Sequence, residues 1–146
     1  MRVEDYTQPW QAARDLTMEI AQLMPDEGYG FKPAPEEMSF GELLDHLAWS
    51  AAAIVGMTVD GKIPFPRPEQ HDRASVRGQI ELCFDYCIRA IQGLDAERFN
   101  QVVGPENRQM PVQMHFWRAY AHVVHHRGQA VVYLRAKGIQ PPAYRF

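Results

Sequence analysis

The chain has 146 residues, of which 46% are hydrophobic and 23% are charged, a balance typical of a globular protein and not of a disordered one. Its net charge of −3 and its scattered basic residues argue against binding to nucleic acid or to an anionic membrane. No segment approaches the roughly 20 apolar residues that span a bilayer, and the start, MRVEDYTQPW, lacks the apolar core of a secretory signal. We therefore expect one cytoplasmic domain over residues 1–146.

Two helices are predicted in the first half of the chain. The first covers residues 7–24, where apolar residues recur at helical spacing before Pro25 and a glycine-containing turn. The second begins at Ser39, because Ser39 and Glu42 fit a capping box, in which each residue bonds the backbone amide of the other. It is expected to end near Asp60.

Two more helices are predicted over residues 74–94 and 111–137. Three prolines between residues 60 and 70 indicate a long, stiff connection, of a kind that often crosses the end of a bundle. The last helix opens at Pro111, a residue favoured in the first turn, and closes at Gly138 as its C-cap. No segment is predicted to be a strand. Four amphipathic helices with long connections predict an all-α four-helix bundle.

Four of the six histidines lie on the last predicted helix. His122 and His126 fall within about 40° of each other around it, on a polar stripe with apolar shoulders. Two imidazoles one turn apart can bind one metal ion at about 2.0–2.1 Å each. Such a pair alone is weak evidence, but His46 on the second helix offers a third nitrogen. The alternatives are a stripe that faces solvent and a histidine whose hydrogen bonds are satisfied within the core.

Other residues near this pattern limit the kinds of site that it could form. His125 either replaces a ligand or, as we expect, packs beside the site. Val123 stands where an H-E-x-x-H metalloprotease has its glutamate, which argues against that class. Cys83 and Cys87, the only cysteines, are interpreted as small buried apolar residues, in preference to a redox pair or metal ligands. We assign them no role.

Two segments resemble the DinB-like (YfiT-like) superfamily, which is regarded as a group of metalloenzymes. SFGELLDHL, from Ser39 to Leu47, is similar to the family's second-helix motif around its first histidine. HVVHHRGQ, from His122 to Gln129, is similar to its H-x-x-H-H-R-G-Q signature. The ending YLRAKG, followed by two prolines, also fits, and the helix spacing extends the resemblance over essentially the whole chain.

The resemblance implies an up-down-down-up bundle, a homodimer, and one divalent metal ion bound by His46, His122 and His126. Three nitrogen ligands suit zinc, nickel, iron or copper, and we expect zinc, nickel or iron. Arg127 is a candidate for binding a substrate carboxylate, although its role could equally be structural. Gln129, Tyr133 and His115 are candidates for polar contacts around the metal or with a substrate.

Members of this family with known activity include thiol-dependent transferases and a maleylpyruvate isomerase, which use low-molecular-weight thiols such as mycothiol or bacillithiol. Three neutral imidazoles leave coordination positions open, and a metal ion lowers the pKa of a thiol that it binds. The leading hypothesis is therefore a thiol S-transferase that acts on small electrophiles. A metal-dependent hydrolase or isomerase, and a non-catalytic stress protein that binds a metal or ligand, are the alternatives.

Overall fold

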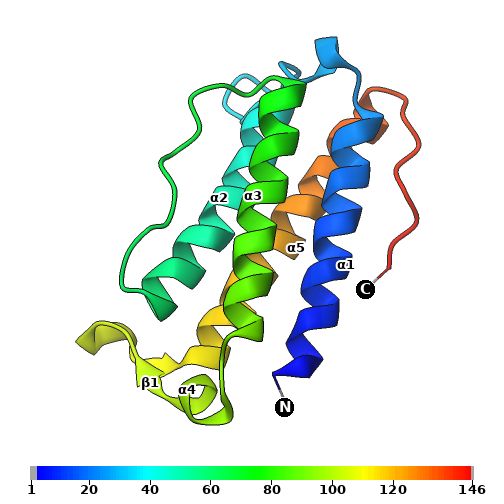
Figure 1. Cartoon of the computed structure of the whole chain (residues 1–146). Coiled ribbons are helices and arrows are strands. Elements are labelled where there is room, and N and C mark those ends of the chain that lie inside the picture. The colour runs from blue at the N-terminus through cyan, green and yellow to red at the C-terminus, as the bar shows by residue number, and fades with distance from the viewer. Residues whose placement is uncertain (1–2, 146) are drawn as a thin grey trace.

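The computed structural model describes residues 3–145, so residues 1, 2 and 146 of the expected domain lie outside the described part. The four long helices are α1 (Glu4–Leu23), α2 (Phe40–Val59), α3 (Arg73–Gln92) and α5 (Val112–Ala136). The shorter helices are α4 (Ala96–Asn100) and the single 3₁₀ turns at Asp26–Gly28 and Glu106–Arg108. The long helices run up, down, down and up (Figure 1), which confirms the expected bundle. Within residues 3–145, no helix has both the length and the apolar character needed to cross a membrane.

Local hydrogen bonds set the ends of these helices. The Ser39 hydroxyl accepts from the Glu42 amide at 3.2 Å, and the Ser39 amide donates to the Glu42 carboxylate at 2.6 Å, which confirms the capping box. Asp72 caps α3 by accepting from the amide of Ser75 at 3.1 Å. After α5, Gly138 adopts a φ of 73°, the left-handed conformation expected of its C-cap.

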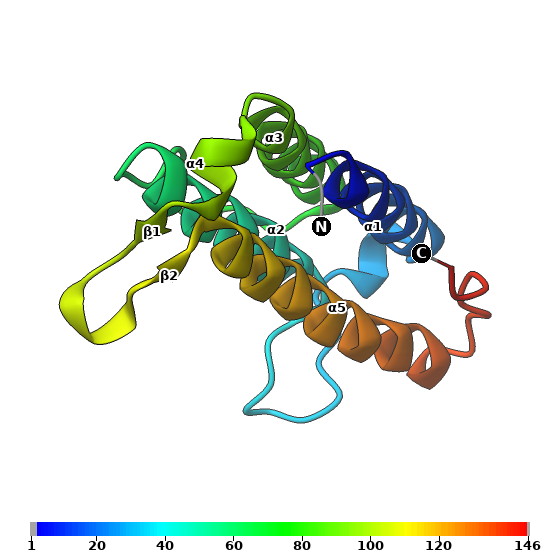
Figure 2. The ribbon, with the colours of Figure 1, turned by 90° about the horizontal axis from the view of Figure 1, so that it is seen from below.

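Helix α2 lies at the centre of the packing. It contacts α3 on one side and α5 on the other, whereas α1 packs mainly against α3. The view along the helices in Figure 2 shows two layers, α1 with α3 and α2 with α5. The largest fully buried side chains are aromatic and come from several elements: Trp10, Phe40, Phe84, Phe99 and Phe116. Burial of each such side chain contributes about 1.5–3 kcal/mol, so the core is the main source of stability.

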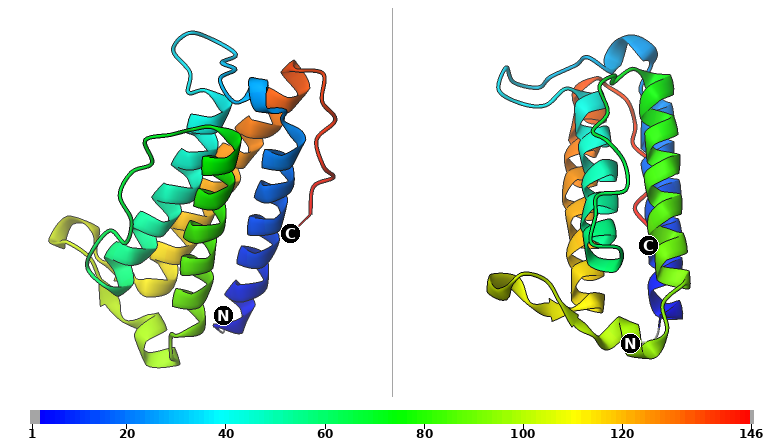
Figure 3. Two further views of the ribbon diagram at one scale, coloured as in Figure 1. Left: turned by 45° about the horizontal axis from the view of Figure 1, so that its top comes forward. Right: turned by 60° about the vertical axis from the view of Figure 1, so that its left-hand side comes forward.

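The connection between α2 and α3, residues 60–72, runs back along the side of α2 (Figure 3) and does not cross the end of the bundle. Two glycines of α2 permit this close approach, because a Cβ atom at Gly41 or Gly56 would collide with the backbone of the connection. Between these two points, the indole N–H of Trp49 donates to the carbonyl oxygen of Phe65 at 3.0 Å. The connection is therefore held against α2 at several points along its length.

Two short strands correct the expectation that the chain has none. β1 (Val102–Val103) pairs antiparallel with β2 (Met110–Pro111), and the resulting hairpin projects from the bundle (Figure 2). Gly104 has a φ of 117°, a conformation that side-chain-bearing residues rarely adopt, directly after β1. Strands of two residues are too short to produce a recognisable alternation of polar and apolar residues, so the sequence pattern could not reveal them.

Candidate metal centre

Three imidazoles from two helices converge between α2 and α5. His46 lies early in α2, and His122 and His126 lie one turn apart in the middle of α5. One nitrogen of each ring lies within 4.8 Å of the corresponding atoms of the other two. Ring centroids are 4.6 Å apart for His46 and His126, and 4.4 Å apart for His122 and His126. The structure thus brings all three predicted ligands together, and no other such group occurs among residues 3–145.

The spacing of the nitrogens fits a shared ion. Two nitrogens that each lie about 2.1 Å from one ion, at about 90–110° to each other, are roughly 3.0–3.4 Å apart. The Nε2 atoms of His122 and His126 are 3.1 Å apart. Nδ1–H of His126 donates to Oε1 of Gln129 at 2.7 Å, which leaves the lone pair of its Nε2 facing His122. The residues present therefore fit a divalent ion that accepts imidazole ligands.

The second nitrogen of each imidazole has different surroundings. Nδ1 of His46 lies 3.5 Å from the Ser50 hydroxyl, at the limit of a hydrogen bond. Nδ1 of His122 is buried and has no hydrogen-bond partner among the described residues. Only His126 therefore has a short hydrogen bond at its Nδ1 atom.

Burial keeps two of these imidazoles neutral. The pKa of His122 is lowered to about 4, mainly by burial and then by the charges of His126, His46 and His125. Burial also lowers the pKa of His46, followed by the charge of His126 and that of the Arg67 guanidinium. Neutral imidazole is the form that binds a metal ion, so both rings are available as ligands at neutral pH.

Two other predicted residues lie at this cluster. His125 packs its ring beside that of His126, with 4.9 Å between the centroids, and its own side chain is exposed. Gln129 orients His126 through the hydrogen bond already described. Both positions are next to one ligand histidine, on the exposed side of α5.

Three predicted residues take part in contacts elsewhere. Nε2 of His115 lies 3.2 Å from the carbonyl oxygen of Val103, so this buried histidine joins α5 to the hairpin. The hydroxyl of Tyr133 donates to the carbonyl oxygen of Met38 at 2.8 Å. Arg127 is buried and lines a cavity with residues of α1 and the C-terminal segment, and none of the three clustered histidines lines that cavity.

Asp45 and His71 are neighbours of His46 that sequence reasoning missed. Asp45 is only 1% exposed, and it accepts a hydrogen bond from Nδ1 of His71 at 2.6 Å. Burial raises the pKa of Asp45 to about 6, although the bond to His71 opposes this rise. A carboxylate within the apolar run before His46 was a usable signal, but nothing in the sequence placed His71 beside it.

A small cavity, here called the α2 pocket, adjoins the histidine cluster. It has a volume of about 230 Å³ and lies between α2 and the 60–72 connection. Its lining consists of Met38, Glu42, Asp45, His46, Trp49, Arg67, Pro68 and His71. His46 belongs both to this lining and to the cluster, whereas His122 and His126 do not line the pocket, so the α2 pocket adjoins the candidate metal centre through His46.

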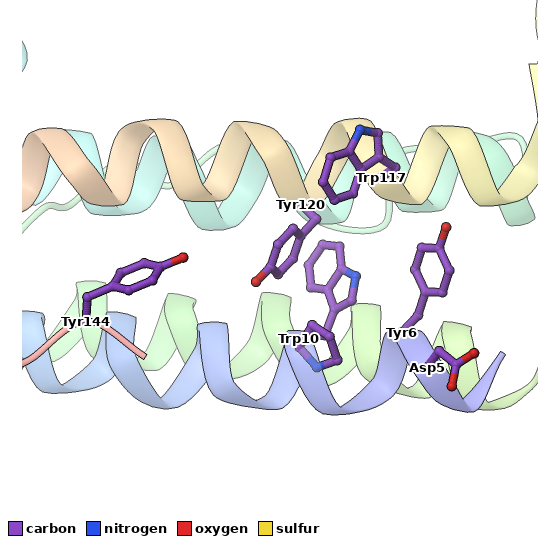
Figure 4. Close-up of a pocket in the computed structure, with 7 residues that line it drawn as sticks. Asp5, Tyr6, Trp10, Trp117, Tyr120 and Tyr144 are labelled. Carbon is purple, nitrogen blue, oxygen red and sulfur yellow. The ribbon is translucent and has the colours of Figure 1, made fainter. Parts of the chain in front are cut away.

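A second cavity, of about 610 Å³, lies between α1 and α5. Figure 4 shows its aromatic lining, with Tyr6 and Trp10 on α1 facing Trp117 and Tyr120 on α5. None of the clustered histidines lines it, so this aromatic cleft is separate from the candidate metal centre.

Comparison with known proteins identifies relatives of similar length. The family model described as DinB superfamily matches residues 10–130. A Bacillus subtilis (strain 168) protein named "Uncharacterized protein YjoA" is 22% identical over 129 residues, covering 86% of this chain and 84% of that protein. A DinB-like protein of Bacillus cereus ATCC 10987 has a similar solved structure, with a TM-score of 0.82, 20% identity and 97% of each chain covered. The solved structure of Bacillus subtilis YjoA, also described as DinB-like, gives a TM-score of 0.82 at 21% identity over 96% of each chain. At these identities the structural matches establish the fold alone.

Proposed function

The chain belongs to the DinB superfamily, and we propose that it holds one divalent metal ion through His46, His122 and His126 and transfers a small thiol to an electrophile. The observation that supports the proposal most strongly is the convergence of three imidazole nitrogens within 4.8 Å. Zinc, nickel and iron all suit such a nitrogen donor set.

In the proposed reaction, the bound ion and the residues around the cluster have distinct roles. The bound ion would supply the positive charge that lowers the pKa of a nearby thiol. His46, His122 and His126 would hold that ion, and three protein ligands leave room for a further molecule, as in catalytic metal sites. Gln129 keeps Nε2 of His126 free of its proton. The α2 pocket beside His46 provides the space for a small thiol.

The attacking thiol must come from outside the chain. Cys83 and Cys87 are both free but completely buried. Burial raises the pKa of Cys83 to about 12 and that of Cys87 well above its ordinary value, so neither forms a thiolate near neutral pH. These cysteines serve the core, as their sequence context predicted.

The proposed reaction balances with a thiol and an electrophile that has a leaving group. The thiol loses its proton to solvent, and its sulfur forms a new bond to the electrophilic carbon. The bond from that carbon to the leaving group breaks, and the leaving group departs with the electron pair. The products are a thioether, the leaving-group anion and one proton, without any change of oxidation state.

A thiol screen tests the proposal. Purified protein, with and without added zinc, nickel or iron, is mixed with 1-chloro-2,4-dinitrobenzene and a panel of thiols that includes cysteine, glutathione and bacillithiol. Metal-dependent formation of thioether, lost in His126→Ala, is the expected result. Turnover of ester or isomerisation substrates without thiol consumption would favour a hydrolase or isomerase. Metal binding with no turnover of any substrate would favour a non-catalytic binding protein.

A further inference from the structure

The α2 pocket restricts the size of the molecule that can enter it. A water molecule occupies about 30 Å³ in the liquid, so the pocket's volume of about 230 Å³ has room for roughly seven waters. A molecule with a few non-hydrogen atoms fits this space, whereas a drug-sized ligand needs at least about 300 Å³. The part of the thiol that lies in the α2 pocket is therefore short.

Arg67 is held in a defined position at this pocket. Its guanidinium carbon lies 4.4 Å above the centre of the Trp49 ring, a cation–π contact. Trp49 is itself fixed, because its indole N–H donates to the carbonyl of Phe65 two residues before Arg67. A cation–π contact does not use the guanidinium N–H groups as donors to an oxygen, so they can still bind a carboxylate.

The charged groups that line the pocket differ in whether they already have partners. The Glu42 carboxylate accepts the amide N–H of Ser39 at 2.6 Å. The Asp45 carboxylate accepts Nδ1–H of His71 at 2.6 Å. No carboxylate forms an ion pair with Arg67 among the described residues. Each acid of the pocket thus accepts a hydrogen bond within the chain, although Oδ1 of Asp45 is buried without a partner among the described residues, and Arg67 offers a fork of donors that has no carboxylate partner.

From this arrangement we infer that the thiol used by this protein carries a carboxylate, and that Arg67 binds this carboxylate while the sulfur lies at the three-histidine cluster. The inference rests on the proposed function, and it adds the chemical class of the thiol. We assign the carboxylate to the thiol and not to the electrophile, because the α2 pocket shares His46 with the histidine cluster. A guanidinium matches the planar carboxylate with two parallel hydrogen bonds.

Three thiols of equal length test the inference by binding, without any measurement of activity. 3-Mercaptopropionate, 2-mercaptoethanol and cysteamine each place one group, respectively anionic, neutral or cationic, two carbons from the sulfur. Cobalt(II) replaces the native ion, and its absorption spectrum reports when a thiolate sulfur joins the imidazole ligands. 3-Mercaptopropionate is expected to bind about tenfold or more tightly than 2-mercaptoethanol, a difference of the size that a charge-assisted hydrogen bond produces.

Variants of two exposed arginines identify the contact. Arg67→Gln should remove the preference for 3-mercaptopropionate over 2-mercaptoethanol. Arg67→Lys should restore part of the preference, because it keeps the charge but loses the fork. Arg108→Gln removes one exposed arginine that does not line the pocket, and it should behave like the unaltered protein. Circular dichroism checks that each variant is folded.

The outcomes separate the two proposals. Three results would contradict the role of Arg67 without contradicting the metal centre. They are equal binding of all three thiols, tightest binding of cysteamine, and an unchanged preference in Arg67→Gln. Failure of cobalt to bind, or failure of every thiol to alter its spectrum, would overturn the proposed function together with the inference that rests on it.

Discussion

The carboxylate of Asp45 accepts a 2.6 Å hydrogen bond from Nδ1 of His71, which lies 26 positions further along the chain. This bond joins α2, next to the candidate ligand His46, to the connection that forms the opposite wall of the α2 pocket. Directly beside it, a Cβ atom at Gly41 would collide with the carbonyl group of His71. The pocket therefore depends on a glycine and a hydrogen bond at one point of contact.

Gly41→Ala should consequently destabilise the protein by about 1–3 kcal/mol, the usual cost of overpacking. Gly78→Ala is a matched control, because Gly78 lies inside α3 with nothing within 4 Å of a new Cβ atom. It should stabilise the protein by about 0.5–1 kcal/mol through helix propensity. Urea unfolding of both variants measures the difference. Equal stability of the two would show that the connection moves aside without cost.

The ligand assignment predicts the effect of removing each histidine. His46→Ala, His122→Ala and His126→Ala should each reduce metal occupancy sharply, since two remaining ligands form a poor chelate. All three variants should stay folded, because the apolar core supplies most of the stability. Elemental analysis with circular dichroism provides both readings. Unfolding of all three would instead indicate a structural metal site.

Two further histidines serve as controls for this series. His125→Ala and His115→Ala should keep most of the metal, because neither belongs to the converging group. His115→Ala should cost about 1 kcal/mol of stability, since it removes the contact with Val103. Loss of the metal in His125→Ala together with its retention in His126→Ala would show that the assignment is wrong by one residue.

The unaltered protein should bind one divalent ion per chain. Zinc, nickel and iron are the expected ions, and elemental analysis after expression in metal-supplemented medium measures the ratio. Absence of metal from protein that was purified without chelators and then incubated with each ion would contradict the proposed centre.

In the metal-free protein, the contribution of His122 to stability should fall as the pH falls from about 6.5 towards 4. The pKa of His122 is about 4 in the folded chain, whereas an unfolded histidine titrates near 6.5. Between these values the unfolded chain binds the proton more readily, so the contribution of His122 is present above about pH 6.5 and is lost on acidification. Asp45 acts in the opposite direction, because its raised pKa favours the protonated folded state. The difference between the unaltered protein and His122→Gln isolates the histidine, and two parallel stability profiles would contradict the prediction.

A homodimer is expected to form through α5. This helix carries a row of apolar or small residues, each exposed or half-buried, at alternating spacings of three and four. They are Met114, Trp117, Ala121, Val124 and Gly128. This spacing is typical of helices that pair along a seam. Sedimentation should give twice the 16.8 kDa of one chain. Ala121→Glu should yield monomers, while Ala74→Glu, at an exposed position on α3, should not. A monomer at micromolar concentration before any substitution would contradict the expectation.

Regular helices made most of the fold predictable from the sequence. Each long helix has an apolar face of its own, and α2 also has a capping box, so its start could be located at Ser39. His46, His122 and His126 could be selected because helical geometry fixes which residues share a face. His115 and Tyr133 share the stripe of His122 but contact the hairpin and Met38, because a helix of 25 residues passes different neighbours along its length.

The pocket beside the histidines could not be predicted in this way. Arg67 and His71 lie in a connection without repeating hydrogen bonds, so no periodicity relates them to α2. Their positions follow from contacts between distant parts of the chain, such as the bond of Trp49 to Phe65. Local sequence patterns do not indicate such contacts.

Because the 60–72 connection runs along α2, the residues that stabilise the fold differ from many of those that would contact a small molecule. The bundle core and the three histidines belong to helices, whereas one wall of the α2 pocket is an irregular segment outside them. Substitutions in that segment can exchange the chemistry that a small molecule meets without disturbing the helices beneath. A library confined to residues 66–70, which keeps Phe65 in contact with Tyr86 of α3, is therefore a direct route to variants that bind different small molecules.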